Sequence, residues 1–136
     1  MRHWLLAFVA GFLAVLCFHQ VALGLLHSAG IVPFAPFSLA STQPLGVPSI
    51  LSASFWGGIW GLALVWVLAQ VGNKLIWLKA ALFGGVALTL VALVVVFPLK
   101  GYGFDLAQLP GRFIIGFILN AFWGVGTLVF LRCFGR

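Results

Sequence analysis

Apolar residues fill four long runs of the chain, and polar residues lie mostly in the segments between them. The runs cover residues 4–27, 50–71, 75–97 and 113–132. Because a transmembrane helix needs about 20 predominantly apolar residues, each run is long enough to cross a bilayer. The pattern predicts an all-α integral membrane protein, with four transmembrane helices in the single domain 1–136.

Basic residues at the ends of these runs predict how the helices are oriented. If the N-terminus lies inside, five Lys and Arg side chains are cytoplasmic and two are external, beside the only acid, Asp105. This distribution follows the positive-inside rule, so we expect both termini in the cytoplasm and the chain in the inner (cytoplasmic) membrane of a bacterium. The cytoplasmic residues are Arg2, Lys74, Lys79, Arg132 and Arg136, and the external ones are Lys100 and Arg112.

The connections between the runs differ in length. Gly72-Asn73-Lys74 is a short turn, so the second and third helices should be antiparallel neighbours. The external loop of about 28–49 carries no charge and contains Pro33, Pro36, Pro44 and Pro48, which rule out a continuous helix. We expect this loop to lie at the membrane interface, buried against the helices.

Self-similarity predicts an internal duplication of one helical hairpin, residues 1–71 and 74–136. A shift of 73 positions aligns the first helix with the third, and a shift of 67 aligns the second with the fourth. We therefore expect two tandem hairpins related by a pseudo-twofold axis along the membrane normal. The shifts place Trp4 on Trp77, Gly11 on Gly84, and Phe55-Trp56-Gly57 on Phe122-Trp123-Gly124.

Small residues recur at a spacing of four on three of the helices, which lets helix backbones approach closely in lipid. Two interpretations remain open for them. They either pack helices of one bundle together or form the interface of a homo-oligomer. The predicted helix-packing residues are Ala7, Gly11, Gly57, Gly61, Ala80 and Gly84.

Five polar side chains fall in the external third of the predicted helices, and we call them the polar cluster: His19, Gln20, Ser52, Ser54 and Asn120. Because an amide or imidazole is costly in lipid, we expect them to face the interior and bond one another. They are either structural hydrogen bonds between helices or a site beneath the external loop. Such a site would hold a lipid headgroup, a quinone or a water-filled vestibule.

Composition excludes several classes of function. Hydrophobic residues make up 64% of the chain and charged residues 6%, which is too few to cover a water-soluble enzyme. The single carboxylate, Asp105, excludes paired-carboxylate catalysis, and no nucleophile motif accompanies it. We predict no catalytic residues, no metal site and no cofactor, because the chain has no CxxC pair, Cys17 points away from His19, and His19 lacks a facing ligand. Without a basic patch interleaved with aromatics, nucleic acid is not an expected partner.

These observations favour a non-enzymatic accessory or scaffold subunit that packs against itself or a larger membrane complex. Its expected partners are anionic lipid headgroups and other membrane subunits or further copies of the chain, with a lipid or quinone held on the external side. The alternative is a small oligomeric channel or transporter with an external vestibule at the polar cluster. A carrier needs polar residues through the whole membrane. The polar side chains of this chain are concentrated in the external half, which favours the accessory or scaffold subunit.

Overall fold

The computed structural model describes residues 1–101 and 103–135, and it confirms four helices long and apolar enough to cross a membrane. They span Arg2–Ser28, Ser49–Val71, Ile76–Leu99 and Leu109–Phe134. The second and third are one residue longer than their predicted runs, the first is three residues longer, and the fourth is six residues longer. The fourth differs most, because the helix begins before Pro110. Proline fits in the first turn, since backbone N–H groups there have no hydrogen-bond partner within the helix.

Two of the spans contain π-helical stretches. The first span consists of α1 (Arg2–Ala14), η1 (Val15–His19) and α2 (Gln20–Ser28). The third consists of α4 (Ile76–Leu82), η2 (Phe83–Leu88), α5 (Thr89–Val91), η3 (Ala92–Val96) and α6 (Phe97–Leu99). The second and fourth are single helices, α3 (Ser49–Val71) and α7 (Leu109–Phe134). A π-helical stretch changes which side chains share a face of the helix, and such stretches are frequent at functional sites.

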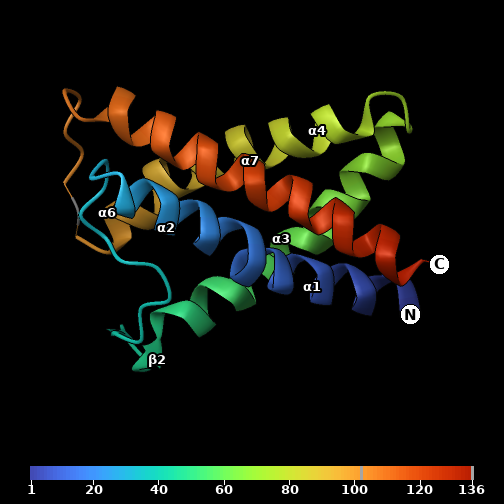
Figure 1. Cartoon of the computed structure of the whole chain (residues 1–136), viewed down its shortest axis with the longest axis horizontal. Coiled ribbons are helices and arrows are strands. Elements are labelled where there is room, and N and C mark those ends of the chain that lie inside the picture. The colour runs from blue at the N-terminus through green and yellow to red at the C-terminus, as the bar shows by residue number, and fades with distance from the viewer. Residues whose placement is uncertain (102, 136) are drawn as a thin grey trace.

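Both chain ends lie at the same end of the bundle as the turn between α3 and α4 (Figure 1). The two longer connections lie at the opposite end. We call the first end the terminal end and the second the loop end. The ammonium group of Lys79 fixes the turn by donating to the carbonyl oxygens of Val71 at 2.6 Å and Gly72 at 3.1 Å. These carbonyls end α3 and have no partner within the helix.

The connection between α2 and α3 contains a short antiparallel hairpin, β1 (Ser41–Thr42) and β2 (Val47–Pro48). Val32 in this segment is buried at 4% exposure, as expected of a loop packed against the helices. Other large apolar side chains of the segment are exposed, contrary to that expectation: Ile31, Phe34, Phe37, Leu39 and Leu45. The short hairpin itself lies away from the centre of the bundle (Figure 1).

The helices of each hairpin cross where small residues meet backbone. A methyl group added at Gly11 would collide with the carbonyl oxygen of Gly57, and one added at Gly84 would collide with that of Asn120. Close approach of this kind is the usual contact between helices in a membrane. All six predicted helix-packing residues are buried, and they lie at contacts between helices of the same chain: Ala7, Gly11, Gly57, Gly61, Ala80 and Gly84.

Comparing the two crossings shows which residues of the second and fourth spans are equivalent. The equivalence differs from the sequence alignment by four residues, about one helical turn. Gly11 meets Gly57, whereas its counterpart Gly84 meets Asn120, so the second helices correspond at an offset of 63 rather than 67. At this offset Gly61 corresponds to Gly124, which meets the carbonyl of Ala80.

The environments of the tryptophans agree with this register. Trp123 is 1% exposed and Trp56 is 57% exposed, so these two residues do not occupy equivalent positions as the alignment predicted. The offset of 63 pairs Trp123 with Trp60 instead. Trp123 reaches the first span at Gly11, and Trp60 contacts the third span at Phe83, with ring centroids 6.0 Å apart.

The first span and α7 lie at the centre of the bundle. The α1 segment packs against both α3 and α7, and α7 also packs against α4 and η2. Contacts between α3 and the third span are sparse, so these two helices form the edges. The central buried cluster comprises Ala14, Val15, Ile50, Leu64, Leu68, Ala80, Trp123 and Leu128.

Candidate functional site

Gln20 of the polar cluster is buried and connects the first span to the loop end. Its side-chain oxygen Oε1 accepts the backbone N–H of Phe37 at 2.7 Å. Its amide nitrogen lies 3.5 Å from Nδ1 of the neighbouring His19. Phe37 has a positive φ of 55°, an uncommon conformation for a large residue, and this hydrogen bond holds its backbone there. Gln20 therefore fixes the position of the loop.

Asn120 of α7 bonds the third span rather than another member of the cluster. Its amide nitrogen Nδ2 donates to the hydroxyl of Thr89 at 3.0 Å. Thr89 is 1% exposed and lies where η2 gives way to α5. Gly116 makes room for it, because a side chain there would meet the Thr89 methyl group at 2.7 Å. The pair is a part-buried hydrogen bond between two helices.

The remaining members of the polar cluster are on the first two spans. His19 and Ser52 are half-buried. Ser54 is fully buried, and its hydroxyl has no hydrogen-bond partner among the residues that the structure describes. The observed hydrogen bonds thus join Gln20 to the loop and Asn120 to Thr89, rather than joining the five members into one network.

A buried polar contact between two helices involves a residue outside the predicted cluster. The indole Nε1–H of Trp123 donates to the carbonyl oxygen of Gly11 at 3.0 Å. The two residues are 112 positions apart in the sequence, so the bond connects the fourth span to the first. Gly57 leaves the space for it, because a methyl group there would lie 3.2 Å from Nε1. The hydroxyl of Thr127 donates to the Trp123 carbonyl at 2.9 Å. A repeated Phe-Trp-Gly pattern drew attention to Trp123, but nothing in the sequence indicated its partner.

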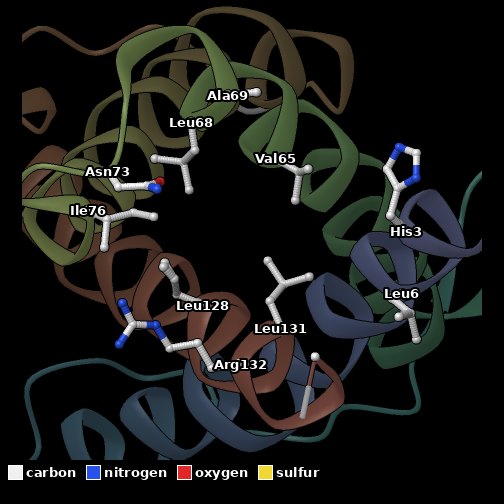
Figure 2. A pocket seen from close by; sticks show the side chains of 11 residues that line it. His3, Leu6, Val65, Leu68, Ala69, Asn73, Ile76, Leu128, Leu131 and Arg132 are labelled. Atoms are coloured by element: carbon white, nitrogen blue, oxygen red, sulfur yellow. The ribbon is translucent and has the colours of Figure 1, made fainter.

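A cavity of about 440 Å³ lies at the terminal end of the bundle, and we call it the end cavity. Figure 2 shows Val65, Leu68 and Leu131 pointing into the space between the helices. The other lining residues come from all four spans and from the turn after α3: His3, Leu6, Ala69, Asn73, Ile76, Leu128, Arg132 and Gly135. The sequence did not predict a cavity here, because its lining residues are far apart in the sequence and come together only when the helices assemble.

The rim of the end cavity is cationic. Arg132 lines the rim, and its guanidinium carbon lies 4.7 Å from the centroid of the Trp77 ring, a cation–π contact. His3 and Asn73 add nitrogen donors at the same end. Lys74, in the turn beside Asn73, contributes a further positive charge. Asp105, the only carboxylate side chain in the sequence, lies in the connection at the loop end.

A second cavity of about 310 Å³ lies toward the loop end, between the third span and α7. Its lining is apolar and includes Leu90, Phe104 and Phe113. Neither of these two cavities is lined by a residue of the polar cluster.

Within residues 1–101 and 103–135, no three His, Cys, Asp or Glu side chains come together in a group that could hold a metal ion. Cys17 and Cys133 are both free thiols on the exposed surface. The chain is thus a membrane-type helical bundle with two distinguishing sites, the contact of Trp123 with Gly11 and the end cavity. No protein-family model matches the sequence, and neither a curated protein nor a solved structure matches it.

Proposed function

We propose that the chain is a non-enzymatic accessory or scaffold subunit of a membrane, which packs against a larger membrane complex or against further copies of itself. One observation carries this proposal. Three polar side chains inside the spans are engaged in bonds that hold the protein together: Trp123 with Gly11, Asn120 with Thr89, and Gln20 with the backbone of Phe37. Groups used in this way are not free to bind or transform a substrate.

The proposed setting is the inner membrane of a bacterium, with both termini in the cytoplasm. The charge distribution supports this orientation, since the terminal end carries most of the basic residues. A reporter active only outside the cytoplasm should be inactive when fused after Arg136 and active when inserted at Gly101. The reverse result would contradict the orientation.

An ancestral duplication of the hairpin is part of the proposal. Equivalent contacts of Gly11 with Gly57 and of Gly84 with Asn120 support it, as does the correspondence of Trp60-Gly61 with Trp123-Gly124. Superposing the two hairpins at offsets of 73 and 63 should align both pairs of spans in an experimental structure. Hairpins that align only at unrelated offsets would contradict the duplication.

Native mass spectrometry of the gently extracted full chain tests the packing role. We expect a defined assembly, either a homo-oligomer or a complex with another membrane protein. A photo-crosslinker at Ile59 of the edge helix α3 should capture the same partner, because Ile59 is exposed and the opposite face of α3 packs on α1. A chain that is monomeric and crosslinks only to lipid would contradict the proposal.

The alternative is a small oligomeric channel or transporter with an external vestibule at the polar cluster. The buried, unpaired hydroxyl of Ser54 favours it, because water or a ligand would supply the missing hydrogen bond. The variant His19→Gln separates the two functions. In a transporter it should abolish ion or solute flux into vesicles while thermal stability is retained. In a scaffold, any loss of assembly should follow the loss of stability.

A further inference from the structure

We propose that the end cavity binds one anionic phospholipid, with part of an acyl chain between the helices and the phosphate group beside Arg132. The inference is independent of the packing role above, because it concerns a site on the single chain. Three observations support it: the apolar walls of the cavity, the cationic groups at its rim and the depth of the rim relative to exposed tryptophans.

The walls match an acyl chain in chemistry and in size. Leu6, Val65, Leu68, Leu128 and Leu131 line the cavity with aliphatic carbon. Its volume of about 440 Å³ lies in the range of small-molecule sites, although it is too small for a whole phospholipid. Water filling this space would face aliphatic surfaces that offer it no hydrogen bonds, so a hydrocarbon chain is the more favourable occupant.

The rim selects a negative charge. Arg132 presents a planar guanidinium that can donate two hydrogen bonds to a phosphate, and the face of the Trp77 ring orients it. His3 and Asn73 supply further donors around the opening. Since the sequence has one acidic side chain, Asp105 at the loop end, no Asp or Glu competes for Arg132.

The opening lies at the depth of lipid headgroups. Three exposed tryptophans, Trp4, Trp66 and Trp77, lie near the ends of their helices on the terminal side. Tryptophan is enriched at the membrane–water interface, so these side chains mark the headgroup region. A lipid of that leaflet would therefore enter with its phosphate at the rim and its chain directed toward the bundle centre, the orientation that it already has in the bilayer.

The test measures which lipid the purified full chain retains. The protein is incubated in detergent with phosphatidylglycerol or with phosphatidylcholine carrying the same acyl chains, and native mass spectrometry records bound lipid. We expect one phosphatidylglycerol per chain, held about tenfold more tightly than phosphatidylcholine because of the charged hydrogen bonds. Equal retention of the two lipids would overturn the assignment.

Matched variants locate the site. Arg132→Gln should remove the preference for phosphatidylglycerol, whereas Arg112→Gln should keep it. The control is close, because Arg112 also lies on α7 against an aromatic ring, with its guanidinium carbon 5.9 Å from the centroid of Phe97, but nearer the loop end. Loss of the preference in Arg112→Gln alone, or in neither variant, would place the binding elsewhere and refute the proposal.

Filling the cavity tests the role of the acyl chain. Val65→Phe should prevent retention of phosphatidylglycerol, whereas Val95→Phe, on an exposed position of the third span, should not. Ala69→Phe, at another lining position, repeats the test in case Val65→Phe fails to fold, as judged by circular dichroism. Retention by a folded filled variant would refute the proposal. Displacement of the lipid by inorganic phosphate alone would identify an anion site without an acyl-chain requirement, and would also overturn it.

Discussion

Replacing Trp123 with phenylalanine should destabilise the bundle far more than the same replacement at Trp56. Both tryptophans stand in a Phe-Trp-Gly triplet, so the local sequence is matched. Trp123 is 1% exposed and donates to the Gly11 carbonyl, whereas Trp56 is 57% exposed. The comparison therefore isolates burial and hydrogen bonding from the type of residue changed.

The expected cost at Trp123 has two parts. The Gly11 carbonyl still accepts the backbone N–H of Val15 after the indole is lost, so it is not left unpaired. The hydrogen bond then contributes toward the low end of measured values in membranes, about 0.5 kcal/mol. Losing part of a buried ring adds about 1–2 kcal/mol. Trp123→Phe should therefore lower the free energy of unfolding by about 2 kcal/mol, and Trp56→Phe by less than about 0.5 kcal/mol.

Reversible unfolding in mixed micelles, in which the fraction of denaturing detergent is raised stepwise, measures this difference. Circular dichroism reports the helices, and each variant is compared with the unaltered chain at equal protein concentration. Equal effects of the two substitutions would refute the reasoning, because the structure gives Trp56 no comparable buried contact. A cost at Trp123 below about 0.5 kcal/mol would show that the indole hydrogen bond and its packing contribute nothing measurable.

Two further predictions test the contacts between helices. Gly57→Ala should cost about 1–3 kcal/mol, because the added methyl group would meet Val15 and the Gly11 carbonyl. Gly111→Ala, where the space is open, should leave unfolding unchanged or stabilise the helix slightly. In a double-mutant cycle, Thr89→Val and Asn120→Leu should show a coupling energy of about 0.5–1.5 kcal/mol in the same assay. Strictly additive effects would mean that their hydrogen bond is not formed in the membrane.

The four spans could be predicted from the sequence because length and hydropathy decide whether a segment crosses a bilayer, and both are local properties. The limits of the fourth span were harder to predict. Pro110 and Arg112 are typical of a loop, yet Pro110 fits the first turn of α7 and Arg112 donates to Gln108 one turn earlier at 2.7 Å. Side-chain bonding of this kind extends a helix beyond its apolar run.

The partners of the polar residues could not be predicted, because they depend on rotation and depth rather than on composition. The sequence predicted Asn120 near His19, because the two residues have a similar depth. In the structure α7 lies between the first and third spans, and Asn120 bonds Thr89 of the third span. The π-helical stretch at Val15–His19 further alters which side chains share a face of the first span. The end cavity likewise arises only when all four spans have assembled.

The bond from Trp123 to Gly11 also bears on the order of events during biosynthesis. The first hairpin needs only residues up to about 71 to bring Gly11 against Gly57. The indole that completes this contact is synthesised 112 residues after Gly11. Until α7 has been made, the Gly11 carbonyl therefore lacks this donor, and Trp123 does not yet fill the space that Gly57 leaves for the indole. When α7 packs against the first span, Trp123 supplies this donor and joins the two halves of the protein.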